Sequence, residues 1–367
     1  MALAERLKSS QMSPPPAIHD PERNIEFEFV RATENAALNA MHWIGRGDKE
    51  AADAAACDAI YGVFDLVNIR GEVVIGEGIK DNAPGIFLGD KLGTWKKGSP
   101  RLDIALDPID GTTNISKGMA NSICVIAGAE VPGRKRVMKN IPSYYCHKLA
   151  YGPIVKRAIT NFNFTSNWID QPLLETLSFA ARVLSKRMAE VVVLILDRPR
   201  NQTFIDQVRE AGATLRMISD GDITAAVAPS LPDSGVDLYV GIGGTPEGVL
   251  TATALRALGG DLQMRMWFRN DQERKELTRG MRDEEIKAIH RSEEIVAGDS
   301  AIFCATGVTD SPLLPGVKLI GKTAITHSIL MRARSQTVRY IRAVHNLDHK
   351  TIHLRSMQAD HRMREGH

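Results

Sequence analysis

The stretch LDIALDPIDGTTN, residues 102–114, joins an apolar run to three aspartates, a proline, a glycine and two threonines. The segment LDIAL is typical of a strand, so we expect Asp107 at the strand end and Pro108 to stop it. Asp110 follows three residues later, at a spacing that lets its carboxylate and that of Asp107 converge from one tight turn. Gly111 allows a ligand to approach the backbone closely. The stretch predicts either a cation site or an ordinary turn with a helix cap.

The composition limits the classes of function. A chain of 367 residues with 43% hydrophobic content is long enough for one large or two ordinary domains. Its 46 basic and 44 acidic residues give a net charge of +2, which argues against a dedicated nucleic-acid binder. No apolar run approaches the roughly 18 residues that span a bilayer, so we expect no membrane partner.

The N-terminus and the cysteines indicate the compartment. The first residues, MALAERLKSSQMSPPPAIHDPE, lack the apolar core and cleavage site of a secretory signal. The four cysteines are far apart and form no CxxC pair, so we expect buried free thiols in a reducing environment: Cys57, Cys124, Cys146 and Cys304. These features predict a cytoplasmic protein.

The order of patterns predicts an α/β protein. Helical spacing over 22–45 and 48–68 precedes short strands in GEVVIGEG, RLDIAL and SICVIAGAE. After Gly152, helices alternate with strands such as VVVLIL, which favours partly parallel sheets. We expect a flexible arm (1–21), a first α/β region that contains the DPIDGT loop (22–152), a second α/β region (153–345, its final strands possibly returning to the first sheet) and a polar tail (346–367).

Two motifs match the patterns of a phosphate-binding loop and of a metal site. GVKLIGKT, 316–323, matches the P-loop pattern, but VKLI prefers an extended backbone and no helix follows, so we interpret it as a hairpin. His345, His349 and His353 have the spacing of one helical face, which can bind metal. In a polar tail we interpret them as a solvated helix end.

Three further loops resemble the opening stretch in carrying acids beside glycines. GDKEAAD contains Lys49 and Asp53, GEGIKD contains Glu77 and Asp81, and GGTPEG places Glu247 at a helix start. Oxygen ligands without histidine or cysteine favour Mg²⁺ or Mn²⁺ over zinc. Such a cluster suits phosphoester hydrolysis, because divalent ions lower the pKa of water and neutralise phosphoryl charge. Scattered surface acids remain the alternative at this point.

A family resemblance favours the first interpretation. DPIDGTT looks like the DPxDGT signature of the lithium-sensitive, metal-dependent sugar phosphatase superfamily. From about Glu22 to His345 the chain resembles class II fructose-1,6-bisphosphatases of the GlpX type. The similar segments keep one order: WIGRGDKEAAD, VNIRGEVVIGEG, LDRPR, ISDGDITAAVAP, LPDSGVDLYVGIGGTPEGVL, GDSAIFCATGVTD and THSILMRARSQTVRYI. The resemblance implies a layered α/β/α/β/α sugar-phosphatase fold.

The resemblance also implies residue roles. Asp53 and Glu77 would bind one metal ion, and Asp107, Asp110 and Glu247 a second, either Mn²⁺ or Mg²⁺. Lys49, Asp81 and Thr112 would be catalytic, positioning the attacking water and the reacting phosphate. The implied substrate-binding residues are Asp110, Gly111, Thr112, Tyr145, Arg198, Pro199, Arg200, Asp220, Gly221, Asp222 and Gly244. Asp110 replaces the glutamate usual in this class, and Asp103, inside the expected strand, has no matching role.

The implied activity is removal of the 1-phosphate of fructose-1,6-bisphosphate (EC 3.1.3.11), in gluconeogenesis or Calvin-type metabolism. Sedoheptulose-1,7-bisphosphatase or dual activity is the alternative, followed by an inositol-monophosphatase-like enzyme or an inactive phosphosugar sensor. The family also implies a homo-oligomer, a dimer or a tetramer, with a small sugar bisphosphate as its ligand.

Overall fold

Two helices open the part of the chain that the computed structural model describes, which comprises residues 21–76, 85–161 and 167–357. α2 (Pro21–Ala40) continues into the 3-10 helix η1 (Met41–Trp43). α3 (Lys49–Phe64) begins after Asp48, whose side chain accepts a hydrogen bond from a backbone N–H of the first turn at 2.9 Å. This cap satisfies a donor that the helix itself leaves unpaired. Both helices were expected, although α3 ends earlier than predicted.

The first sheet has eight strands. Its order is β2, β1, β3, β4, β11 and β13, and both β12 and β14 also pair with β13. β1 and β3 are parallel, whereas the other pairs are antiparallel. The bounds are β1 (Arg70–Ile75), β2 (Lys91–Leu92), β3 (Arg101–Asp110), β4 (Ile123–Glu130), β11 (Ile302–Gly307), β12 (Lys318–Ile320), β13 (Thr323–Arg332) and β14 (Thr337–Asn346).

The second sheet has six strands in the order β10, β9, β5, β8, β6 and β7. β6 is parallel to both β7 and β8, as the alternation of helices and strands predicts, and the remaining pairs are antiparallel. The bounds are β5 (Tyr145–Tyr151), β6 (Val192–Leu196), β7 (Thr214–Ile218), β8 (Leu238–Gly244), β9 (Asp261–Trp267) and β10 (His290–Arg291).

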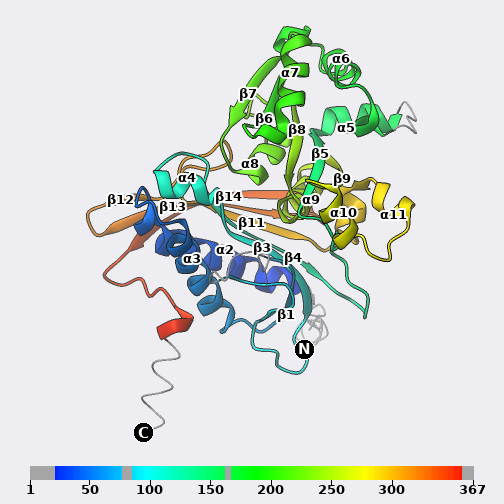
Figure 1. The fold of residues 1–367 in the computed structure, drawn as a ribbon. Coiled ribbons are helices and arrows are strands. Elements are labelled where there is room, and N and C mark those ends of the chain that lie inside the picture. The colour runs from blue at the N-terminus through cyan, green and yellow to red at the C-terminus, as the bar shows by residue number, and fades with distance from the viewer. Residues whose placement is uncertain (1–20, 77–84, 162–166, 358–367) are drawn as a thin grey trace, which may run out of the picture.

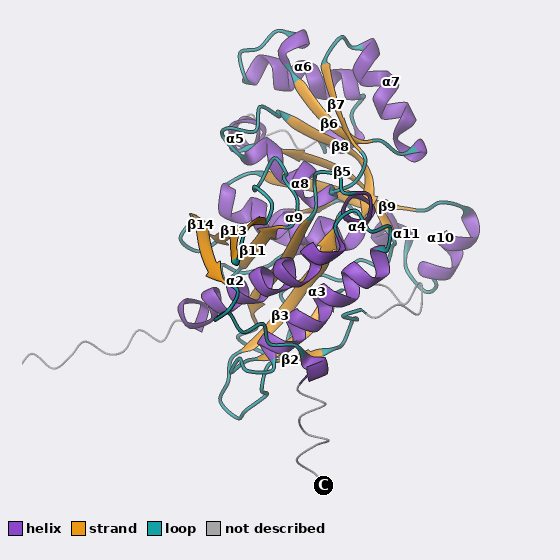
Figure 2. Cartoon of the chain, turned by 90° about the vertical axis from the view of Figure 1, so that its left-hand side faces the viewer, coloured by secondary structure: helices purple, strands orange, loops and turns teal. Residues whose placement is uncertain are grey.

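Helices cover both sheets and separate them, giving five layers (Figure 1). Figure 2 shows α2 and α3 crossing the outer face of the first sheet. The middle layer contains α8 (Asp222–Val227), α9 (Thr245–Leu258) and α12 (Ser292–Ile295), and the far layer contains α5 (Pro153–Asn161), α6 (Leu173–Val183) and α7 (Gln202–Glu210). The shorter helices are α4 (Thr112–Lys117), α10 (Asp271–Leu277), α11 (Asp283–Lys287), η2 (Trp168–Asp170), η3 (Met188–Glu190), η4 (Pro199–Asn201) and η5 (Ala228–Ser230). The layered α/β/α/β/α prediction is confirmed.

Alternation along the strands explains the layers. On β3, Ile104 and Leu106 pack toward α2 and α3, while Ala105 packs toward α9. Small residues dominate the α9 face, where Ala252 and Ala254 are fully buried, so helix and sheets approach closely. Among the described residues, no helix is long and apolar enough to cross a bilayer. The four cysteines are buried and form no disulfide with the described residues, as expected.

Three local expectations can be compared with the structure. GVKLIGKT forms the antiparallel β12–β13 hairpin, so the hairpin interpretation is confirmed. The helical interpretation of the histidines is wrong at His345, which belongs to β14, is buried, and has its Nε2 at 2.8 Å from Oγ1 of Thr326. Pro108 does not end β3, which continues to Asp110 through a register shift.

Residues 353–356 lie against α3. The guanidinium of Arg355 donates to both carboxylate oxygens of Asp65, at 2.9 and 2.6 Å. The His353 carbonyl covers Gly62, where an added Cβ would lie only 2.1 Å from the carbonyl oxygen. This contact requires glycine, because a backbone carbonyl has little freedom to move away.

We therefore expect Gly62→Ala to displace this segment and to lower the free energy of unfolding by about 1–3 kcal/mol. Thermal unfolding measures the loss, and faster tryptic cleavage after Arg355 measures the displacement. Gly133→Ala is the control, since a Cβ there meets nothing within 4 Å. Equal unfolding midpoints and cleavage rates in both variants would contradict the expected contact.

Candidate active site

Two of the loops predicted for the site meet between the two sheets. Asp110, at the end of β3, accepts a hydrogen bond from the Ile223 N–H at 3.1 Å through its Oδ2. In return, the Thr113 N–H donates to Oδ2 of Asp220 at 3.3 Å, and Nδ2 of Asn114 donates to the Asp220 carbonyl at 3.3 Å. These bonds join the DPIDGTT loop of the first sheet to the SDGD loop of the second.

A bulge in β3 aims the carboxylates of the DPIDGTT loop. Asp107 pairs with Val125 and Asp110 with Ile123, so three steps along β3 match two steps along β4. Pro108 lies within the irregularity, where the missing N–H removes a ladder bond. The proline therefore shifts the register rather than stopping the strand.

Glycines make the loop junction possible. Gly111 has a φ of 94°, and a Cβ there would lie 2.3 Å from the Asn121 carbonyl oxygen. Gly221 has a φ of 95° and faces the same carbonyl. Gly111 is also the N-cap of α4, without a side-chain cap, and Thr112 is the first helical residue.

A second glycine pair makes room for carboxylates at the end of β8. A Cβ on Gly244 would lie 1.9 Å from Oε2 of Glu247, and a Cβ on Gly243 would lie 2.0 Å from Oδ2 of Asp222. Glu247 lies in the first turn of α9, where the helix N-terminus favours a negative charge. The GIGG turn therefore holds two acidic side chains directly against the backbone.

The site concentrates negative charge in a buried volume. Burial raises the pKa of the Asp110 carboxyl, and Glu247, Asp220 and Asp222 raise it further. Burial also raises the pKa of Glu247, while the ammonium of Lys148 opposes the shift. Oε2 of Glu247 is buried and makes no hydrogen bond to any described residue. An acceptor of this kind, beside carboxylates whose ionisation is disfavoured, is suited to a cation.

One positive charge in this region was not anticipated from the sequence. Lys148, on β5, is fully buried, and its Nζ lies 2.6 Å from Oδ2 of Asp222. Tyr239 donates a hydrogen bond to the other carboxylate oxygen. The only signal in the sequence is a lysine inside the apolar strand YCHKLAY. The pair fixes Asp222 and balances part of the acidic charge.

The other predicted ligands come from α3 and β3. Asp53 is buried on α3, and both Asp53 and Asp107 are close enough to Cys124 to raise the pKa of its thiol, which burial raises most. Lys49 is exposed at the start of α3. Glu77 and Asp81 fall outside the described residues. Within 21–76, 85–161 and 167–357, no three His, Cys, Asp or Glu side chains converge as a metal-binding group.

Two of the predicted substrate residues, Arg200 and Gly244, lie beside Tyr145. The guanidinium carbon of Arg200 is 4.6 Å from the centre of the Tyr145 ring, and its Nε donates to the Ile242 carbonyl at 2.9 Å. Nη2 of Arg198 lies 3.5 Å from Oδ1 of Asp220. The segment that contains the two arginines is not extended, because the 3-10 helix η4 begins at Pro199.

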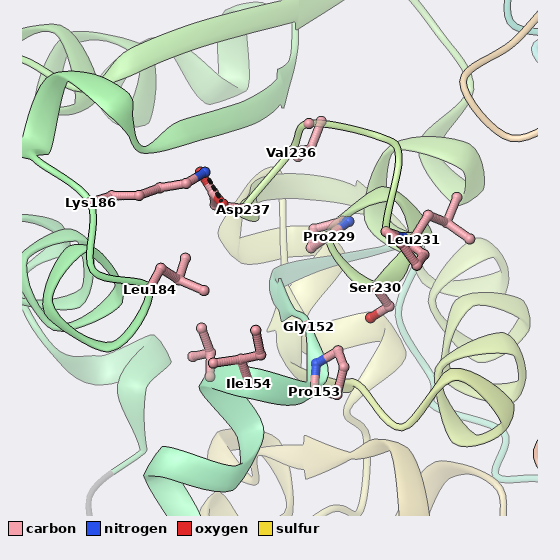
Figure 3. Close-up of a pocket in the computed structure, with 13 residues that line it drawn as sticks. Gly152, Pro153, Ile154, Leu184, Lys186, Pro229, Ser230, Leu231, Val236 and Asp237 are labelled. Atoms are coloured by element: carbon pink, nitrogen blue, oxygen red, sulfur yellow. Dashed lines mark hydrogen bonds and ion pairs between the residues drawn. The ribbon is translucent and has the colours of Figure 1, made fainter.

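A cavity of about 330 Å³ lies elsewhere, at the opposite end of the second sheet (Figure 3). Pro153, Ile154 and Leu184 line it, with the Lys186–Asp237 ion pair at one side. None of the residues predicted for the site lines this cavity. It is therefore separate from the acidic junction.

The fold and the acidic junction between the two sheets together define the class of the protein. It is a layered α/β phosphatase with acidic loops at the sheet ends. The family model of bacterial fructose-1,6-bisphosphatase, glpX-encoded, matches residues 23–345. The chain is 38% identical over 339 residues to the Fructose-1,6-bisphosphatase 1 class 2 of Escherichia coli (strain K12), covering 89% of this chain and 97% of that protein. The Fructose-1,6-bisphosphatase class 2 of Shigella flexneri matches with the same identity and coverage.

The chain belongs to the family of bacterial, glpX-encoded fructose-1,6-bisphosphatases. It is a phosphoric monoester hydrolase of the EC 3.1.3.11 type, acting on fructose-1,6-bisphosphate. The family is one of metal-dependent phosphatases.

Asp110 and Asp103 allow a test of the charged junction, because both are buried on β3. Asp103 accepts hydrogen bonds from Arg136 and from the Val137 and Met138 N–H groups at 2.7–3.1 Å. Asp110 instead faces other acids. Its pKa is raised on folding, so the folded state loses stability as the pH rises through that pKa.

We expect Asp110→Asn to raise the unfolding midpoint of the metal-free protein at pH 7–8, with the gain shrinking as the pH falls. Asp103→Asn, the control, loses satisfied bonds and should destabilise by about 1–3 kcal/mol. Added Mn²⁺ should stabilise the wild type more than Asp110→Asn. Thermal unfolding across pH, with and without Mn²⁺, measures all three effects. If the metal-free Asp110→Asn protein is less stable than the wild type at pH 8, repulsion between Asp110 and the neighbouring acids does not destabilise the fold.

Proposed function

We propose that the chain hydrolyses the 1-phosphate of fructose-1,6-bisphosphate, releasing fructose 6-phosphate and phosphate, with two divalent ions at the acidic junction. The observation that supports this assignment is that a group of acidic side chains lies beside a group with an arginine and a tyrosine. Buried carboxylates of Asp110 and Glu247 lie on one side, and Tyr145 with Arg200 lies on the other. The first suits a cation-assisted reaction at one phosphate, and the second suits recognition of a remote phosphate.

The proposed ligand sets follow the acidic loops. Asp53 and Glu77 would hold one ion, and Asp107, Asp110 and Glu247 the other, with Mn²⁺ or Mg²⁺ as the ion. Support comes from the hard oxygen donors and from the buried, unbonded Oε2 of Glu247. When bound, such ions lower the pKa of water and neutralise phosphoryl charge.

Residues beside the ligands would handle the reacting groups. Thr112 is the first residue of α4 and follows Asp110 by two positions, and we assign its hydroxyl to orienting the attacking water. Asp81 would accept the proton of that water, and Lys49 would hold the phosphate through its ammonium. Gly111 allows the reacting phosphate to approach the backbone.

Substrate binding would depend on the second sheet. Arg198 and Arg200 supply guanidinium groups for the 6-phosphate, and Pro199 fixes the turn between them. Tyr145 would contact the sugar, and Asp220, Gly221 and Asp222 would face its hydroxyls. The carboxylate of Asp222 is already fixed by Lys148 and Tyr239, which gives it a defined orientation for this role. Gly244 offers a backbone contact. The binding energy of the remote phosphate helps to orient the reacting one.

We expect the double substitution of Arg198 and Arg200 by alanine to lower kcat/KM for fructose-1,6-bisphosphate by about 100-fold or more, since each charged hydrogen bond contributes roughly 1.5–3 kcal/mol. Phosphate release with Mn²⁺ or Mg²⁺ measures the loss. Arg209→Ala, which removes an exposed arginine paired with Asp206, is the control. Unchanged activity in the double variant would favour an inositol-monophosphatase-like site.

The same assay identifies the preferred substrate. We expect release from fructose-1,6-bisphosphate and slower or no release from inositol 1-phosphate. Preference for sedoheptulose-1,7-bisphosphate would assign the site to the longer sugar. Sugar-phosphate binding without any phosphate release, even at high enzyme concentration, would indicate a sensor.

A further inference from the structure

An arginine that follows β9 lies against two tyrosines at the start of β5. The guanidinium carbon of Arg269 is 5.5 Å from the ring centre of Tyr144 and 5.9 Å from that of Tyr145. Strand register explains this placement, because Tyr145 pairs with Trp267 and Arg269 comes two residues later. On its other side Tyr145 pairs with Gly244. The sheet itself therefore brings Arg269 beside the proposed sugar-binding tyrosine.

A buried carboxylate holds Arg269 in place. Its Nε lies 2.5 Å from Oε2 of Glu273, whose side chain is 6% exposed, whereas that of Arg269 is 50% exposed. Glu273 is fixed in the first turn of α10, where its N–H donates to the Asn270 side chain at 2.8 Å. An exposed arginine with such an anchor loses less side-chain entropy when it binds a ligand.

Arg269 and Arg200 are anchored in the same way. Each uses Nε, toward Glu273 in one case and toward the Ile242 carbonyl in the other. Neither uses its terminal amino groups in a hydrogen bond to the described part of the chain. Those groups form the planar pair that binds a phosphate through two parallel bonds. Two such pairs beside the Tyr145 ring suit a phosphate dianion.

We propose that Arg269 binds the remote phosphate of the sugar bisphosphate together with Arg200, and that Glu273 is its positioning residue. The inference rests on the proposed function in one respect, the location of that phosphate beside Tyr145 and Arg200. Arg269 would be a specificity-determining residue, because its interaction is made only by substrates that carry a second phosphate. It lies more than 60 residues from the LDRPR motif in sequence, so the motif alone does not reveal it.

Binding of fructose 6-phosphate tests Arg269 separately from the reaction, because this ligand carries only the remote phosphate. We expect Arg269→Ala to weaken its Kd by about tenfold or more. The same variant should lower kcat/KM for fructose-1,6-bisphosphate, with a rise in KM as the larger part of the loss. Arg269→Lys keeps the charge without the planar pair of donors and should lie between wild type and alanine. Glu273→Gln should weaken binding less than Arg269→Ala, because the guanidinium remains.

The neighbouring helix offers a matched control. Arg282 is exposed and paired with Glu285 at 2.8 Å, so Arg282→Ala removes a similar surface ion pair and should leave Kd unchanged. Thermal unfolding shows whether each variant is folded. If Arg269→Ala does not fold, the Kd of Arg269→Lys provides the test instead. If Arg200→Ala weakens the binding of fructose 6-phosphate but neither Arg269 variant does, the role of Arg269 is wrong and the location of the phosphate still holds. Unchanged binding in both Arg200→Ala and Arg269→Ala would overturn the phosphate location, and the role of Arg269 with it.

Discussion

The hydrogen bond from the Ile223 N–H to Asp110 is the constraint on which the site depends. It joins the end of β3, in the first sheet, to the start of α8, which packs against the second. Its acceptor is a buried carboxylate surrounded by other acids, so the folded state places like charges where water cannot screen them. A fold that needed only stability would replace these acids with apolar residues. Their presence at the junction of the layers is the physical signature of a site that binds positive charge.

Three features of the surrounding structure accommodate this cost. Lys148 is fully buried against Asp222 and supplies a positive charge beside the acidic loops. Glycines at 243 and 244 leave space for carboxylates at distances that no Cβ allows, so Glu247 and Asp222 lie directly against the backbone. The small residues of α9 let both sheets approach one helix, which brings the two sets of loops within hydrogen-bonding range. Charge, glycine placement and helix packing therefore act on the same junction.

Periodic patterns in the sequence were enough to predict the α/β layers, the two opening helices and the β12–β13 hairpin. Burial of one face of a helix or strand makes apolar residues recur at regular intervals in the sequence. Features that depend on contacts between distant segments were not predictable in this way. Pro108 looked like a strand end, but pairing with β4 carries the strand past it as a bulge. His345 looked helical, yet ladder pairing with β13 makes it part of a strand. Lys148 and Arg269 belong to no recognisable sequence motif. Asp222, the partner of Lys148, is 74 residues away, and Arg269 contacts an aromatic ring from a distant part of the chain.

Strand register places the two halves of the proposed site next to each other. β5 lies between β8 and β9, and Tyr145 pairs with Gly244 on one side and Trp267 on the other. The row across the sheet consists of Gly244, Tyr145 and Trp267; Glu247 lies three residues beyond Gly244, in α9, and Arg269 lies two residues beyond Trp267. A shift of one residue in either pairing would turn Tyr145 to the opposite face relative to its neighbours. The separation of negative and positive groups is thus fixed by backbone hydrogen bonds, which are far less adaptable than side chains. A bisphosphate with one end suited to cations and the other to arginines would be oriented by the sheet before any chemistry begins.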